Sequence, residues 1–144
     1  MIANNTLAGS ATTPAASSTL LHQAILADAI VSGAVGLVLL VGASPLGDEL
    51  GLSPLLLRWV GVILLPWFAL LGYLGTRGRI PVPAACAVIG ANLLWVLASF
   101  LVLATGWVEP TALGNAFVIG QALAVVLFAE LQYLGLWRAT SAVT

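Results

Sequence analysis

The stretch from Glu109 to Arg138 constrains the fold of this chain more than any other segment. It begins with a Glu-Pro pair, continues with apolar residues for about the 20 positions that a helix needs to cross a bilayer, and ends at Trp137 and Arg138. Two polar side chains, Gln121 and Glu130, lie within it. Hydrocarbon does not tolerate such groups without partners. The stretch therefore predicts a membrane-spanning helix whose polar residues have a partner or a function.

The whole chain has the composition of an integral membrane protein. Of its 144 residues, 61% are hydrophobic and 6% are charged, whereas about 25% of the residues in an ordinary soluble domain are charged. The apolar residues come in long unbroken runs rather than in alternation, which predicts an all-α membrane protein and excludes a membrane β-barrel. A formal net charge of −1, with no lysine, argues against nucleic acid as a partner.

Four apolar runs predict four transmembrane helices, at about 21–43, 54–76, 82–105 and 110–137. They form one domain over residues 20–138, which we expect to fold as an antiparallel up-down bundle. Residues 1–19 are expected to be a flexible polar tail, and residues 139–144 a short C-terminal tail. The tight turn at 76–81 predicts that the second and third spans are antiparallel neighbours. Pro66 predicts a kink in the second span.

The arginines predict the orientation of the chain. Two of them, Arg77 and Arg79, lie in the second loop, and Arg138 lies near the C-terminus. The first and third loops instead carry acidic residues, which are Asp48, Glu49 and Glu109. The positive-inside rule then places both termini in the cytoplasm, and we expect the membrane to be the inner membrane of a bacterium.

Arg58 is the one arginine that this orientation does not explain. It lies at the outer end of the second span, on the same side as the acidic loops. We expect a structural ion pair there with Asp48, Glu49 or Glu109, and anion binding is the alternative.

Polar residues inside the spans are the candidates for a functional site. Asp28 and Glu130 lie at matching depth, about 10 Å from the cytoplasmic side at 1.5 Å per residue, and together predict a proton or ligand site. Gln121 and Glu130 are nine positions apart, so they face opposite sides of one helix. One of the two is therefore expected to face a second copy or another subunit.

Asn92, Trp95 and Ser99 share one face of the third span, and Asn92 lies near the midplane, as does Gln121. These four residues are candidate polar contacts at the midplane. Hydrogen bonding between helices is one interpretation of them, and contact with a ligand is the other.

Catalytic and metal-binding patterns are not found. His22 is the only histidine and Cys86 the only cysteine, which excludes an internal disulfide and a thiolate metal cluster. Cys86 is interpreted as a small packing residue. Since no nucleophile, metalloprotease or nucleotide-binding motif occurs in a suitable context, we expect neither a metal, nor a cofactor, nor an enzyme.

The chain resembles small four-helix integral membrane proteins of bacteria. The matching features are the Asp28-Ala29 pair, the segment N-L-L-W at 92–95, and the run L-G-N-A…Q-A…A-E-L…G-L-W-R from Leu113 to Arg138. This resemblance implies a four-helix membrane fold and no particular activity. In size and helix number the chain is also similar to small multidrug transporters, which use a carboxylate in the first helix to exchange protons for cations. Asp28 is its counterpart by position, although those transporters have Glu there, nearer the midplane.

Two classes of function follow from the sequence. The first is a non-catalytic membrane protein that binds a partner or scaffolds a complex. The second is a small proton-coupled transporter that acts as a dimer through Asp28 and Glu130. In both, the expected partners are membrane lipids and either a second copy of the chain or a larger membrane complex.

Overall fold

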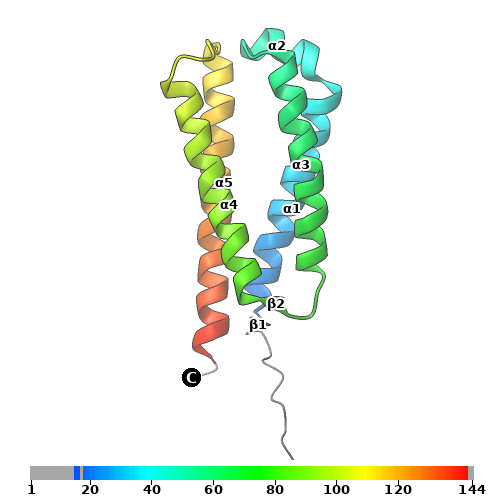
Figure 1. Ribbon diagram of the computed structural model, residues 1–144, viewed down its shortest axis with the longest axis vertical. Helices are drawn as coiled ribbons and strands as arrows, with labels where there is room; N and C mark the ends of the chain where they lie inside the picture. The colour runs from blue at the N-terminus through cyan, green and yellow to red at the C-terminus, as the bar shows by residue number, and fades with distance from the viewer. Residues whose placement is uncertain (1–14, 17, 143–144) are drawn as a thin grey trace, which may run out of the picture.

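The computed structural model of the protein describes residues 15–16 and 18–142 (Figure 1). Four long helices and one short helix make up nearly all of it. The elements in chain order are β1 (Ala15–Ala16), α1 (Thr19–Val41), α2 (Ala43–Leu50), α3 (Pro54–Gly75), β2 (Ile80–Pro81), α4 (Val82–Ala104) and α5 (Ala112–Ser141). The predicted spans fall on α1, α3, α4 and α5, and each of these helices is long and apolar enough to cross a membrane. The prediction of an all-α, multi-pass membrane protein is confirmed.

Local sequence signals set the ends of the helices. The hydroxyl of Ser18 accepts a hydrogen bond from the Leu21 N–H and caps α1, and Thr111 caps α5 by accepting from Gly114. Pro54 begins α3, where its missing N–H costs nothing. α3 is one helix from Pro54 to Gly75 and includes Pro66.

The first loop differs from the prediction. It contains the helix α2, which ends at Gly51 in the left-handed conformation with φ of 65°. A glycine there is favourable because a side chain would be strained. The Thr111 N–H also donates to the Leu50 carbonyl, so the end of α2 is joined to the start of α5.

The N-terminal segment is also more ordered than a flexible tail where the structure describes it. Ala15 and Ala16 pair antiparallel with Pro81 and Ile80. The Ser18 hydroxyl donates to the Gly135 carbonyl at 2.9 Å. Residues 1–14 and 17 of the predicted tail lie outside the described residues.

The long helices pack as two pairs. α1 packs along α3, α4 packs along α5, and the pairs are joined mainly by α1 against α5. Figure 1 shows the pairs diverging toward the end that carries α2. The second and third spans, predicted to be antiparallel neighbours, do not pack closely along their length although a short turn connects them. Side chains of both helices meet in the hydrophobic cluster near that turn, to which Leu71 and Ala85 belong. A tight turn fixes only the ends of two helices, and their side chains decide whether the rest of their length packs.

Glycines allow the close approach of α1 to its neighbours. A Cβ added at Gly61 of α3 would lie 2.7 Å from the Gly36 carbonyl oxygen of α1. A Cβ at Gly135 of α5 would lie 2.6 Å from the Leu21 backbone nitrogen. Small residues at such crossings bring backbones together, which is how helices associate in lipid.

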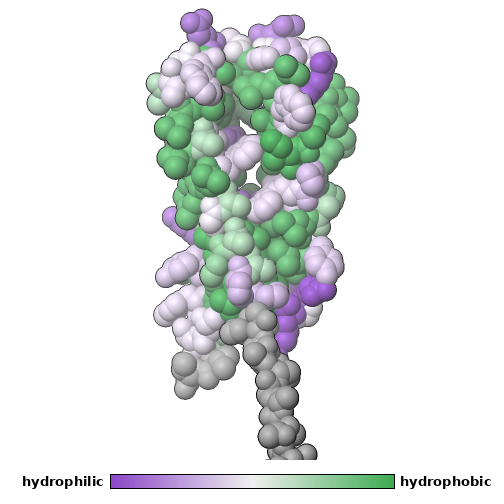
Figure 2. Space-filling view, in the orientation of Figure 1, coloured by the Kyte–Doolittle hydropathy of each residue, from purple (hydrophilic) through white to green (hydrophobic). Residues whose placement is uncertain are grey.

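The outer surface is apolar along most of its height. Figure 2 shows hydrophobic side chains over the middle of the molecule and hydrophilic ones gathered near its two ends. Tryptophans lie exposed toward both ends, with Trp107 in the α4–α5 loop and Trp137 near the end of α5. This distribution is typical of a bundle surrounded by lipid with aromatic residues at the interfaces.

We predict that Gly61→Ala destabilises the bundle by about 1–3 kcal/mol, because the new methyl group must push α1 away from α3. Gly72→Ala in the same helix is the matched control, since a Cβ there meets nothing within 4 Å, and the exchange is expected to be neutral or slightly stabilising. Thermal unfolding in detergent, followed by circular dichroism, measures both. Equal stability of the two variants would contradict the proposed contact.

Candidate functional site

A buried carboxylate lies at the centre of the bundle and joins three helices. Asp28 of α1 is 1% exposed. Its Oδ2 accepts hydrogen bonds from Asn92 Nδ2 of α4 at 2.7 Å and from Gln132 Nε2 of α5 at 2.9 Å. Its Oδ1 accepts from the Ser32 hydroxyl, one turn along α1, at 3.1 Å. Three donors aimed at one carboxyl group suit a carboxylate, which only accepts hydrogen bonds.

The two amides of this cluster also bind each other. Asn92 Nδ2 donates to Gln132 Oε1 at 3.1 Å, and both side chains are buried. The carboxylate fixes the orientation of each amide, because a flipped amide would turn an oxygen toward Asp28. We call Asp28, Asn92 and Gln132 the buried triad.

A second polar cluster lies between α4 and α5, nearer to the α2 end than the buried triad. Trp95 Nε1 donates to Gln121 Oε1 at 2.8 Å, and Gln121 Nε2 donates to the Ser99 hydroxyl at 2.9 Å. Ser99 in turn donates to the Trp95 carbonyl at 2.8 Å. These bonds hold α4 against α5, so hydrogen bonding between helices is the observed role of this cluster.

A cavity of about 730 Å³ separates the two helix pairs. All four long helices line it, and Figure 2 shows the hollow between the two halves of the molecule. Its walls are mainly apolar and aromatic, with Trp67, Trp95, Phe117 and Phe128 among them. A smaller cavity of about 220 Å³ continues toward α2 and shares Trp95, Phe117 and Gln121 with the first.

The buried triad forms one end of this cavity. Ser32 and Asn92, both bonded to Asp28, line the cavity, whereas Asp28 and Gln132 lie behind them. Beyond the triad, toward the α3–α4 turn, the bundle is filled by a hydrophobic cluster that includes Leu21, Ile25 and Leu71. The cavity therefore lies near the middle of the spans and ends at a polar floor.

Glu130 does not join Asp28, so the predicted carboxylate pair is wrong. Glu130 is exposed, and Gln132 occupies the position beside Asp28. Two residues along a helix are turned by about 200°, so α5 cannot present both side chains to the same neighbour. Matching depth on two helices carries no information on the direction in which each side chain points.

The predicted midplane contacts divide between two clusters. Asn92 belongs to the buried triad, whereas Trp95, Ser99 and Gln121 form the second cluster. Asp28 and Asn92, which were expected at different depths, are bonded directly to each other. The signal for Gln132 was present in the sequence, since it is a polar residue inside the fourth span.

The predicted ion pair of Arg58 is replaced by a different contact. Arg58 Nη2 donates to the Ser44 hydroxyl at 3.1 Å, not to Asp48, Glu49 or Glu109. All these residues lie toward the α2 end, where water solvates the charges, so pairing them gains little. Among the described residues, no group of three His, Cys, Asp or Glu side chains is placed to hold a metal ion.

Comparison with known protein families, with curated proteins and with solved structures found no match to this chain. The assignment of a function therefore rests on the cavity and the buried triad.

We predict that Gln132→Leu destabilises the protein by about 3 kcal/mol, because it removes a donor from a buried carboxylate. The triple variant Asp28→Leu, Asn92→Leu, Gln132→Leu is expected to recover much of this loss, since it removes the charge together with its partners. Thermal unfolding of both variants in detergent measures the effect. A single variant as stable as the unmodified protein would show that the triad does not hold the bundle together.

Proposed function

We propose that this protein is a non-catalytic binding protein for a lipophilic molecule, which enters the cavity sideways from the bilayer between α3 and α4. The observation that carries the proposal is the cavity itself. Its volume of about 730 Å³ lies within the range of about 300–1,000 Å³ that is typical of small-molecule sites. Its walls are apolar with a few polar groups, as in sites that bury a hydrophobic ligand.

The path into the cavity supports entry from the membrane. The backbones of α3 and α4 do not approach closely, and Ile63 and Leu70, which line the cavity from α3, are about half exposed at 54% and 46%. In a bilayer these side chains face lipid tails. A hydrophobic molecule can therefore pass from the membrane into the cavity without crossing water.

No residue in the cavity wall offers covalent chemistry. The polar side chains there are Ser32, Asn92, Gln121 and the indoles of two tryptophans, and the carboxylate of Asp28 lies behind the wall. The one basic group of the described residues that contacts the Ser32 hydroxyl is the Asp28 carboxylate, whose other oxygen already accepts from two amides. Binding is thus the activity that this geometry supports best.

We place this site in the bacterial inner membrane, and the charge distribution supports an orientation with both termini in the cytoplasm. Arg77 and Arg79 lie at the α3–α4 turn, and Figure 1 places this turn at the same end as the C-terminus and β1. The acidic residues lie at the α2 end. A reporter that is active only in the periplasm, fused after Thr144, should give no signal, and a strong signal would reverse the orientation.

We predict that Gly120→Leu abolishes ligand binding by filling the cavity. Gly120 lines the cavity, and a Cβ there meets nothing within 4 Å, so the leucine enters open space without strain. Gly90→Leu in α4 is the matched control, since its Cβ also meets nothing but it does not line the cavity. The measurement is native mass spectrometry of lipophilic molecules retained by the purified protein in nanodiscs. Equal retention by both variants would refute the cavity as the site.

A further inference from the structure

The polar groups of the cavity that are not bonded to the second cluster gather at one end of it. Ser32 of α1, Trp67 of α3 and Asn92 of α4 all lie toward the triad. The smaller cavity at the other end is lined mainly by apolar side chains, and its polar ones, Trp95, Ser99 and Gln121, are bonded to one another. A ligand that fits this space has one polar end and a longer apolar part. Its polar end lies beside the triad, and its apolar part points toward α2.

Asn92 presents a free acceptor to this end of the cavity. Its Nδ2 is occupied by Asp28 and Gln132, which leaves Oδ1 without a donor among the described residues. Every fully buried side-chain nitrogen and oxygen of the described residues has a hydrogen-bond partner. Asn92 Oδ1 is therefore accessible, and the cavity is the space that Asn92 borders. A donor on the ligand would form a hydrogen bond with this unpaired acceptor and so strengthen binding.

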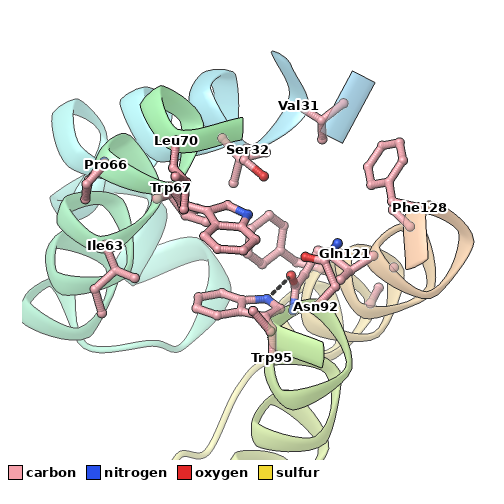
Figure 3. A pocket seen from close by; sticks show the side chains of 18 residues that line it. Val31, Ser32, Ile63, Pro66, Trp67, Leu70, Asn92, Trp95, Gln121 and Phe128 are labelled. Atoms are coloured by element: carbon pink, nitrogen blue, oxygen red, sulfur yellow. Dashed lines mark hydrogen bonds between the residues drawn. The ribbon is translucent and has the colours of Figure 1, made fainter. Parts of the chain in front are cut away.

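Trp67 presents a free donor from the opposite wall. Figure 3 shows its indole inside the cavity with the ring nitrogen turned toward the open space. Among the described residues Trp67 Nε1 has no acceptor, in contrast to Trp95 Nε1, which donates to Gln121. An indole N–H can only donate, so Trp67 calls for an acceptor on the ligand.

The surrounding charges disfavour an ionised ligand. None of the four arginines lines the cavity, so an anion would find no counter-charge and would face the carboxylate of Asp28 behind Asn92. The three donors around Asp28 already satisfy this carboxylate, and it is 1% exposed, so a cation cannot contact it.

The depth of the cavity in the bilayer also disfavours a charged ligand. Ser32 lies 13 residues into α1, about 20 Å from its start, and Asn92 is also near the middle of its helix. A phospholipid would have to bring its charged headgroup to the bilayer centre to place a polar atom there, which is costly. Only its tails can enter the cavity.

We infer that the site selects a neutral lipophilic alcohol: a hydroxyl group that accepts from Trp67 Nε1 and donates to Asn92 Oδ1, on a hydrocarbon body that extends toward α2. A hydroxyl both donates and accepts, so its chemistry matches one free acceptor together with one free donor. This inference rests on the proposed binding function and specifies its ligand class.

The test compares molecules that share one hydrocarbon chain and differ only at the end: hexadecanol, hexadecyl methyl ether, hexadecane, hexadecanoate and hexadecyltrimethylammonium. Each is titrated as a mole fraction of the bilayer into nanodiscs holding the full chain, and bound molecules are counted by native mass spectrometry. We expect hexadecanol to bind about five-fold more tightly than the ether, and the ether about five-fold more tightly than hexadecane, since each step removes one hydrogen bond.

Two variants test whether the Trp67 N–H causes the preference for the ether over hexadecane. Trp67→Phe keeps an aromatic ring but removes the N–H, so it should abolish the preference for the ether over hexadecane and leave hexadecane binding unchanged. Trp137→Phe is the matched control, because this exposed tryptophan near the end of α5 lines neither cavity, and it should leave the ratios unchanged.

The outcomes separate the inference from the function on which it rests. Tighter binding of hexadecanoate or of the ammonium compound than of hexadecanol overturns the alcohol class, as does a Trp67→Phe variant with unchanged ratios. If hexadecane and hexadecanol bind equally and Gly120→Leu removes both, the cavity binds lipophiles without selecting a hydroxyl. If Gly120→Leu reduces the binding of none of these compounds, the proposed function itself is wrong.

Discussion

The architecture of this protein depends on one ionisable group that has no access to water. Asp28 is buried at mid-bundle in a protein whose surroundings are hydrocarbon, so every partner must come from the protein itself. α4 and α5 each supply an amide donor. Because a carboxylate left short of donors is costly, the bond pattern holds α1 in register with both helices of the other pair.

The cavity follows from how differently the two ends of the bundle are packed. On the side of the triad toward the α3–α4 turn, glycines let the helices approach closely, as at Gly135 against Leu21, and apolar side chains fill the centre. On the other side, the crossing at Gly36 and Gly61 holds α3 close to α1, whereas the bonds of Trp95 and Gln121 hold α4 close to α5. Each pair is tight within itself, so the space remains between the pairs. The hydrophobic effect does not close it, because lipid tails are as apolar as its walls.

Much of the fold could be predicted from the sequence, and less of the site. Apolar run lengths locate the four spans because the bilayer thickness sets the length of a spanning helix. The importance of Asp28 and Asn92 was also visible, since polar groups are rare in such spans. Their partners were not predictable in the same way. Whether Gln132 or Glu130 faces Asp28 depends on the rotation of α5 about its axis, and α5 is apolar on all sides, so its sequence has no polar face to indicate that rotation. The loose packing of α3 against α4 was not predictable either, because the turn that connects them fixes only the ends of the two helices.

The same physics explains why hydrogen bonds rather than apolar contacts must decide what this cavity holds. In water, a hydrophobic ligand gains free energy by leaving the solvent. In a bilayer that gain is absent, because the ligand is already dissolved in hydrocarbon and any lipid tail can fill the same apolar space.

Apolar walls therefore define the shape of the site and contribute little to selectivity. A hydrogen bond formed at the bilayer centre has no competing water. A ligand that forms one therefore binds more tightly than a lipid tail, which has no hydrogen-bonding group. The free acceptor of Asn92 and the free donor of Trp67 are two such groups, and the acceptor is oriented by Asp28. The buried carboxylate that aligns the helices thus also fixes the polar end of the site.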